Sequence, residues 1–297
     1  MGSRKRKLQD QLEEEKLKNK KIKEKTNKIK VQPEDETSNT PEIQKTTQNK
    51  WLRRLPKPED VVKLEYKDFN FEDYYKQDQS YATAIIGSRY SGKTVFYHYK
   101  LYPKHKKYND LNIKFCENLQ AEAYDYLDEK DKIFAYEKFH PEIINDMFKF
   151  AKKSNNLLKT HFDFDDCSSK KNNKNNEFIN QIYIRGRNNK ISITFSTQDM
   201  MYISNTNRGN LDFLFLLKSN IPSMKKKIIE NFLMDLVPIP EQWYTKAQRE
   251  RYLYHWYEAH CDNLDEHGII FINFRNAEMF HFKVDIEKEE KLMKKYK

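Results

Sequence analysis

The middle of the chain alternates between short apolar runs and longer segments whose apolar residues recur at helical spacing. Short apolar or alternating runs are typical of strands, and an apolar residue every third or fourth position is typical of a helix. Strands that alternate with helices predict an α/β fold with a largely parallel central sheet. The predicted strands span residues 82–86, 111–115, 132–136, 157–166, 191–195 and 213–217. The predicted helices span residues 93–102, 141–151, 178–186, 222–233 and 241–260, and a hairpin is predicted at 269–274 and 279–284.

The first predicted strand leads directly into the pattern G-x-x-x-x-G-K-T. In such a loop, glycines let backbone N–H groups close around a β-phosphate, the lysine reaches the β- and γ-phosphates, and the threonine hydroxyl ligates Mg²⁺. The whole chain has only six glycines, which indicates that two so close together stand where a Cβ does not fit. The sequence therefore predicts an ATP site, with an ordinary glycine turn as the alternative. Its predicted lining residues are Gly87, Ser88, Arg89, Tyr90, Ser91, Gly92, Lys93 and Thr94.

An acidic strand end is the second part of the predicted site. Nucleotide hydrolysis needs carboxylates that hold Mg²⁺ and orient the attacking water. The predicted strand at 157–166 ends in Asp165 and Asp166, so we expect Asp165 on the metal side with Thr94, and Asp166 polarising the water. Asp163 in the same strand leaves the register open. An acidic turn that caps a helix is the alternative to a catalytic role.

Three further residues are candidates for contacts with the γ-phosphate. Gln198 follows the predicted strand at 191–195, where an uncharged amide at a strand's carboxyl end can hydrogen-bond both water and phosphate. Arg187 and Arg208 each adjoin one of the scarce glycines. A guanidinium stabilises charge on a transferring phosphoryl group, and ring ATPases supply it from a neighbouring subunit. Surface glutamines and arginines are common, so these residues are weaker candidates than the loop.

The basic character of the chain is concentrated in its first part. The net charge is +10, and residues 1–30 contain twelve basic and five acidic residues. Residues 1–50 contain no aromatic residue, and aromatic residues begin at Trp51. We expect a disordered tail here, or a helix that forms only on a partner. The tail is predicted to add sequence-independent affinity for DNA, with nuclear localisation or capsid docking as alternatives.

The predicted organisation has four parts: the basic tail at 1–50, a connecting segment at 51–79, the phosphate-loop core at 80–240, and a helix with a β-hairpin at 241–297. The apolar runs are shorter than the roughly 18 residues that a membrane helix needs, so we expect no membrane span and a soluble intracellular protein. Cys116, Cys167 and Cys261 lack metal or redox spacing and are expected to be reduced thiols.

Together these motifs resemble the poxvirus-type virion DNA-packaging ATPases of large DNA viruses, virophages and related mobile elements, in the FtsK/HerA branch of P-loop ATPases. Two positions differ: Asn188 stands where many members have histidine, and Asp163 makes its strand more polar than usual. The matching residues are Gly87 to Thr94, Phe164 to Asp166, Gly186 and Arg187 before Lys190 to Ile193, Thr197 and Gln198, and Arg208 to Asn210 before Leu214 to Leu216.

The resemblance implies an additional-strand, RecA-like P-loop NTPase that uses ATP and Mg²⁺. It further implies a homo-oligomeric ring that threads double-stranded DNA into a capsid, with a capsid or portal component as a partner. It ranks Arg208 above Arg187 as the arginine acting across subunits. The expected location is the host cytoplasm, a viral factory or the virion. A helicase or a plasmid-transfer pump is the alternative within this chemistry, and a nucleotide-switched DNA-binding assembly protein is the alternative outside it.

Overall fold

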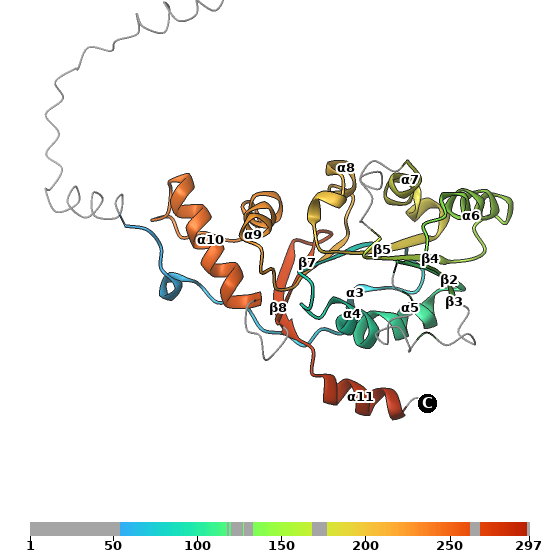
Figure 1. Ribbon diagram of the computed structural model, residues 1–297, viewed down its shortest axis with the longest axis horizontal. Coiled ribbons are helices and arrows are strands. Elements are labelled where there is room, and N and C mark those ends of the chain that lie inside the picture. The colour runs from blue at the N-terminus through green and yellow to red at the C-terminus, as the bar shows by residue number, and fades with distance from the viewer. Residues whose placement is uncertain are drawn as a thin grey trace, which may run out of the picture. The chain divides into compact units, whose positions relative to one another are not determined.

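The computed structural model describes residues 54–117, 119, 127, 133–167, 177–261 and 268–295 (Figure 1). The chain divides into two units, Met1–Lys50 and Trp51–Lys297, and all described residues belong to the second. The predicted basic tail at 1–50 lies outside the described residues. None of the described helices is long and apolar enough to span a bilayer.

Within the described residues, eight strands form one sheet in the order β3-β2-β4-β5-β1-β6-β7-β8. The strands β1 to β6 pair in parallel, β7 is antiparallel to β6, and β8 is antiparallel to β7. The strands are β1 (Ala82–Ile86), β2 (Leu111–Cys116), β3 (Ile133–Tyr136), β4 (Thr160–Asp165), β5 (Ile191–Thr197), β6 (Phe213–Leu216), β7 (Gly268–Asn273) and β8 (Glu278–Lys283). The predicted α/β class, its largely parallel sheet and the final hairpin are confirmed. Strand β5 lies between β1 and β4, as an additional-strand fold requires.

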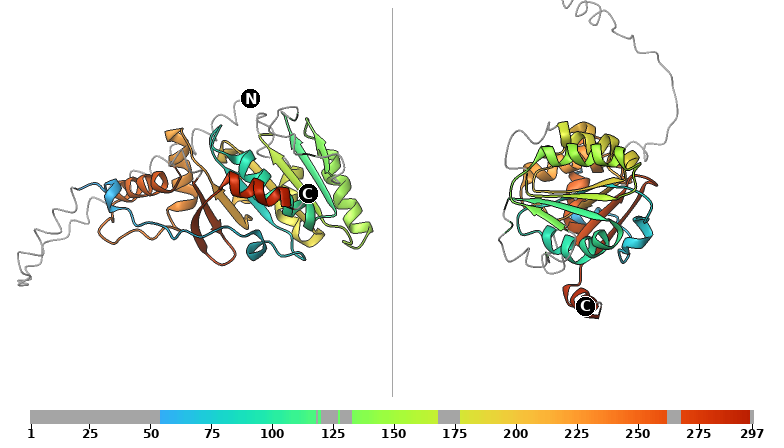
Figure 2. Two further views of the ribbon diagram at one scale, coloured as in Figure 1. Left: turned by 90° about the horizontal axis from the view of Figure 1, so that it is seen from below. Right: turned by 90° about the vertical axis from the view of Figure 1, so that its right-hand side faces the viewer.

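Helices cover both faces of this sheet (Figures 1 and 2). One face is covered by α6, α7 and α9, and the other by α4 and α5. The helix α11 follows the hairpin, and its Glu290 accepts a 3.0 Å hydrogen bond from the Tyr99 hydroxyl. The α-helices are α3 (Phe71–Tyr74), α4 (Lys93–Phe96), α5 (Tyr102–Tyr108), α6 (Pro141–Lys153), α7 (Glu177–Arg185), α8 (Asn205–Arg208), α9 (Pro222–Ile228), α10 (Lys246–Cys261) and α11 (Ile286–Lys295).

The strands at the centre of the sheet are apolar on both faces. In β6, Leu214 and Leu216 join the core under α6, α7 and α9, while Phe213 and Phe215 join the core on the opposite face. All four side chains are buried, which is typical of a central strand with helices on both sides. This packing fixes β1, which pairs with β5 and β6, and thereby fixes the start of the phosphate loop.

The prediction that the helix at 93–102 ends before Pro103 is wrong. A π-helical turn, Tyr97–Leu101, joins α4 to α5, so helical backbone continues from Lys93 to Tyr108. Proline has no backbone N–H and disrupts a regular helix interior, but it is tolerated in a first turn. Here Pro103 stands in the first turn of α5, directly after the π turn.

The connecting segment before β1 crosses α10 and reaches β8. The backbone N–H of Val62 donates to the Tyr252 hydroxyl at 3.1 Å, and that of Leu64 donates to His260 Nε2 at 2.8 Å. Tyr66 then forms a parallel bridge with His281 of β8. These contacts cover part of the sheet's last strand.

The strands β2, β4 and β5 are polar on the face toward α4 and α5. His161 of β4 is buried there, with Nε2 3.0 Å from the Thr194 hydroxyl, and its ring stacks on His105 of α5 at 3.9 Å between centroids. Burial lowers the pKa of His105 to about 3 and holds the pKa of His161 well below its usual value. Both imidazoles are therefore neutral in the fold at physiological pH.

Replacing His105 by phenylalanine keeps a ring in this layer and removes the titratable group. The pKa of His105 is depressed from 6.5 to about 3, so its stabilising effect is present above pH 6.5 and is lost as the pH falls toward 3. Between about pH 7 and about pH 5, we expect the free energy of unfolding to fall by about 2 kcal/mol more in the wild type than in His105→Phe.

Urea unfolding at both pH values measures this difference. Phe195→Leu, a core substitution that changes no titratable group, is the control and should keep the wild-type pH dependence. Equal pH dependence in the wild type and His105→Phe would contradict a neutral buried His105.

Candidate nucleotide-binding site

The phosphate loop is anchored between the carboxyl ends of β5 and β6. The N–H of Gly87 donates to the Thr197 carbonyl at 3.2 Å, and the N–H of Ser88 donates to the Lys218 carbonyl at 2.8 Å. The Ser88 hydroxyl accepts a 2.7 Å hydrogen bond from the N–H of Asn220. The loop therefore begins from a fixed position at the centre of the sheet.

The two glycines of the motif are required for different reasons. Gly92 has φ 90° just before α4, in the left-handed region that residues with a Cβ rarely adopt. At Gly87 a Cβ would clash with the Ser91 hydroxyl and lie 2.9 Å from the Leu217 Cβ. Tyr90 between them has φ 62°, and its side chain is 89% exposed. The backbone here thus forms the tight loop that the motif predicts.

Lys93 is buried at the base of the loop. Its ammonium donates to the carbonyls of Gly87 and Ser88, both at 3.1 Å. Burial lowers the pKa of Lys93, and the carboxylates of Asp166 and Asp165 oppose that shift. The ammonium is therefore held inside the loop by carbonyl oxygens, in the place where phosphate oxygens would bind.

Asp165 and Asp166 stand at the carboxyl end of β4. Asp165 is level with Ser196 of β5, and Ser196 is level with Ile85 of β1, so two strand spacings, about 10 Å, separate β4 from the loop strand. Asp166 leaves the strand with φ 48°, and its N–H donates to the Ser196 carbonyl at 3.2 Å. Both acids thus lie at the same edge of the sheet as the loop.

Gln198 meets Asp166 at this edge. Its side-chain amide donates to Asp166 Oδ2 at 3.0 Å. Burial raises the pKa of Asp166, and the charge of Lys93 and the hydrogen bond from Gln198 oppose the shift. The structure therefore brings together three of the predicted residues: Lys93, Asp166 and Gln198.

Asp163 lies deeper in the sheet than Asp165, on the same face of β4. It is level with Lys114 of β2 and forms an ion pair with it. Burial raises the pKa of Asp163 to about 6, and the Lys114 ammonium opposes that rise. Asp165 lies two residues nearer the carboxyl end of β4, which is the edge of the sheet where the loop begins.

The arrangement fits Mg²⁺ brought by a nucleotide. In nucleotide sites this ion takes one or two protein oxygens and completes its shell with phosphate oxygens and water. The Thr94 hydroxyl at the start of α4 and the Asp165 carboxylate at the end of β4 are the residues that would hold it. Asp165 is the last residue of β4, so its buried side chain lies at the edge of the sheet from which the loop starts.

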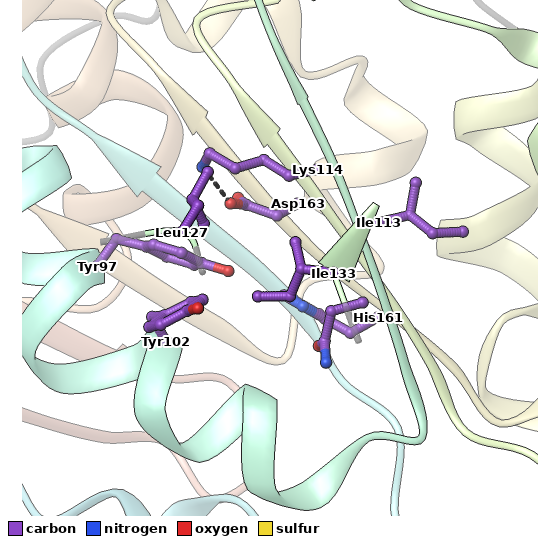
Figure 3. A pocket seen from close by; sticks show the side chains of 9 residues that line it. Tyr97, Tyr102, Ile113, Lys114, Leu127, Ile133, His161 and Asp163 are labelled. Carbon is purple, nitrogen blue, oxygen red and sulfur yellow. Dashed lines mark hydrogen bonds and ion pairs between the residues drawn. The ribbon is translucent and has the colours of Figure 1, made fainter. Parts of the chain in front are cut away.

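Sequence reasoning missed the side chains that lie behind the acids. Figure 3 shows Lys114 and Asp163 directed toward each other beside the ring of Tyr97, in a pocket that His161 also lines. The Lys114 ammonium lies 4.8 Å from the centre of the Tyr97 ring. Alternation in 111–115 puts Lys114 on the polar face of its strand, but it gives no sign that this face is buried.

Arg187 lies at the opposite edge of the sheet from its own phosphate loop, just before β5. Its guanidinium donates to Asp212 Oδ1 at 2.6 Å, and Arg275 Nε donates to the same oxygen at 2.7 Å. The other carboxylate oxygen of Asp212 accepts from the N–H of Ala82 at 2.8 Å. The Asp212 side chain is buried, whereas that of Arg187 is 51% exposed. Among the described residues, no contact that we observe joins Arg187 to Lys93 or Asp166.

Arg208 ends α8 and contacts its own turn. Its guanidinium donates to the Ile203 carbonyl at 3.2 Å and to the Asn205 side chain. The side chain is partly buried, and burial lowers its pKa. Among the described residues, no contact that we observe joins Arg208 to Asp166 or Gln198.

The chain was compared with known proteins. No protein-family model matches it, and no curated protein matches its sequence. Its structure is similar to the genome packaging NTPase B204 from Sulfolobus turreted icosahedral virus 2, with 12% identity and a TM-score of 0.49 over 69% of this chain and 97% of that one. It is also similar to the pCW3 conjugation coupling protein TcpA, with 12% identity and a TM-score of 0.47 over 75% of this chain and 67% of that one.

A third similar structure is EssC from Geobacillus thermodenitrificans, with 19% identity and a TM-score of 0.38 over 55% of this chain and 36% of that one. At these identities and TM-scores the similarity does not assign the chain to a family.

Removing the Asp212 carboxylate should destabilise the protein, because two guanidinium groups and a buried N–H lose their acceptor. We expect Asp212→Ala to lower the free energy of unfolding by about 3 kcal/mol. Asp146→Ala is the control, since Asp146 and Lys149 form an exposed pair that should contribute less than about 1 kcal/mol.

A double-mutant cycle with Arg187→Ala measures how much of this loss belongs to Arg187. A coupling energy of about 1–2 kcal/mol is expected for a hydrogen-bonded ion pair with one buried partner. Strict additivity of Arg187→Ala and Asp212→Ala would show that the pair contributes nothing to stability.

Proposed function

We propose that the protein is an ATP-hydrolysing motor that translocates double-stranded DNA, and that its task is to package a viral genome into a capsid. The observation that carries the ATPase proposal is the hydrogen bond from Gln198 to Asp166 beside Lys93 and the phosphate loop. A loop alone binds nucleotide, whereas this arrangement adds an acid for the water and an amide for the γ-phosphate. ATP and Mg²⁺ are the proposed ligands.

In the proposed mechanism Lys93 exchanges two carbonyl partners for oxygens of the β- and γ-phosphates. This exchange does not require the lysine to be moved out of water, because its ammonium is already buried. Asp166 orients the attacking water and accepts its proton, and its raised pKa makes it a stronger base than an exposed carboxylate. Thr94 and Asp165 would hold Mg²⁺, which would supply positive charge that offsets the charge of the phosphates.

Gln198 gives the site a way to report its nucleotide state. Its side-chain amide nitrogen donates a hydrogen bond to Asp166. A γ-phosphate or an attacking water offers the same amide an alternative partner, so the hydrogen bond to Asp166 would break or be shared. Movement of Gln198 would then reach β5, which ends one residue earlier at Thr197.

The link to DNA and to a ring rests on the sequence motifs and the charge of the tail. Residues 1–30 carry a surplus of seven positive charges, which suits sequence-independent contacts with phosphates. Arg208 or Arg187 is proposed to complete the site of a neighbouring subunit, and a capsid or portal component is the proposed docking partner. A helicase or plasmid-transfer pump would use the same site. A nucleotide-switched assembly protein would bind ATP with little turnover.

Lys93→Ala should abolish ATP turnover while the fold remains, because the lysine's charge offsets phosphate charge. Asp166→Asn should still bind ATP and should lower kcat by about 10²- to 10⁴-fold, the usual contribution of a general base. Steady-state hydrolysis and nucleotide titration measure both. Lys107→Ala, in the same continuous helix but exposed, is the control with wild-type turnover.

Double-stranded DNA tests the motor itself. We expect the ATPase rate of the wild type to rise when linear duplex DNA is added, and strand separation of a forked duplex to be absent. Strand separation would favour a helicase instead. Tight ATP binding with no turnover, with and without DNA, would favour the switch, and near-wild-type turnover in Asp166→Asn would overturn the site.

Arg208→Ala should bind nucleotide normally and hydrolyse it poorly if the arginine acts across a subunit boundary. Mixing it with Lys93→Ala subunits should restore part of the activity, because some interfaces then pair an intact Arg208 with an intact Lys93. The same mixture with Arg187→Ala in place of Arg208→Ala compares the two arginines. Absence of rescue in both mixtures would place neither arginine in a neighbour's site.

A further inference from the structure

A buried ionic cluster lies directly behind the proposed metal position. Lys114 of β2 forms an ion pair with Asp163, and its ammonium is 3.6 Å from Asp165 Oδ2. The side chains of all three residues are at most 4% exposed. Strands of a parallel sheet are usually apolar on both faces, so charged groups at these positions need a reason.

The register explains how Lys114 reaches both acids. Lys114 is level with Asp163 on the neighbouring strand, and Asp165 lies two residues further along the same face. Lys114 therefore lies between the carboxylate of Asp163, deep in the sheet, and that of Asp165, at the end of β4. Asp163 has the closer contact, and Asp165 is shared between Lys114 on one side and the charge of Lys93 on the other.

Tyr97 fixes the lysine from the opposite side. Its ring lies 4.8 Å from the Lys114 ammonium, a cation–π distance, and its hydroxyl hydrogen-bonds Asp163. Tyr97 opens the π-helical turn and lies one helical turn after Lys93. Such π turns occur often at functional sites. The cluster thus joins the helix after the phosphate loop to the acidic strand.

We infer that Lys114 is a positioning residue for the metal-side aspartate: it holds the Asp165 carboxylate in place for Mg²⁺ and does not itself touch nucleotide. This inference rests on the proposed function. Groups that orient a metal ligand from outside the coordination sphere typically change metal affinity or activity by 10- to 100-fold. In a purely structural role, Lys114 would only offset the free-energy cost of burying the Asp163 carboxylate.

The two roles predict different Mg²⁺ dependence. With saturating ATP, we expect Lys114→Met to raise the Mg²⁺ concentration for half-maximal ATPase rate by about 10- to 100-fold, with a smaller change in the rate at saturating Mg²⁺. Binding of ATP in the presence of a chelator should stay as in the wild type. Lys225→Met is the matched control, because Lys225 is also buried, pairs with Glu258 at 2.8 Å and lies 5.1 Å from the Tyr254 ring.

A second pair of variants separates positioning from structure. Asp163→Asn keeps Lys114 for Asp165 and should retain the wild-type Mg²⁺ dependence. The double variant Lys114→Met/Asp163→Asn removes the lysine together with its main partner, so it leaves no unpaired charge at position 163. The Mg²⁺ defect should persist in this double variant. Recovery of wild-type Mg²⁺ dependence there would overturn the inference and leave Lys114 a structural counter-ion.

The outcomes are distinguishable from failure of the proposed function. If the wild type shows no Mg²⁺-dependent hydrolysis, the proposed function fails. If the wild type hydrolyses ATP and Lys114→Met has an unchanged Mg²⁺ midpoint, the inference alone fails. Thermal unfolding identifies a Lys114→Met protein that does not fold, and the double variant, whose interior carries one charge pair fewer, then decides the question.

Discussion

Every ionised side chain inside the sheet must find a partner, and this constraint governs the region around the phosphate loop. An unpaired buried charge costs several kcal/mol, whereas a paired and hydrogen-bonded one is tolerated. The Lys93 ammonium donates hydrogen bonds to two carbonyls of its own loop. The Lys114 ammonium forms a close ion pair with Asp163 and a longer one with Asp165. The buried charges of Lys93 and Lys114 therefore connect the loop, the helix that follows it and the acidic strand.

The two edges of the sheet use buried acids for different purposes. At the carboxyl edge Asp165 and Asp166 stand beside the loop, where a bound nucleotide would change their surroundings. At the amino edge the Asp212 carboxylate accepts hydrogen bonds from Arg187, Arg275 and the N–H of Ala82. Ala82 begins the strand that leads into the loop. The Asp212 cluster and the phosphate loop thus lie at the two ends of one short strand, β1.

Features that depend on nearby residues were predictable from the sequence. The loop follows from its motif, and the strands and most helices follow from apolar spacing, since both signals lie within about ten residues. The partner of Lys114 was not predictable, because it depends on the register between β2 and β4, whose paired residues Lys114 and Asp163 lie 49 positions apart. The continuation through Pro103 depends on a π turn that composition does not indicate.

The same limit explains the two arginines. The motifs ranked Arg208 above Arg187, and the sequence carried no sign that Asp212 would bind Arg187 from a position 25 residues away. The Arg208 guanidinium donates hydrogen bonds to oxygens of Ile203 and Asn205. To contact a neighbouring subunit it would have to exchange those partners. Arg187 keeps about half of its side chain exposed while a buried carboxylate fixes its guanidinium. If either arginine met a neighbouring subunit, the fixed and exposed guanidinium of Arg187 would lose less conformational entropy than that of Arg208.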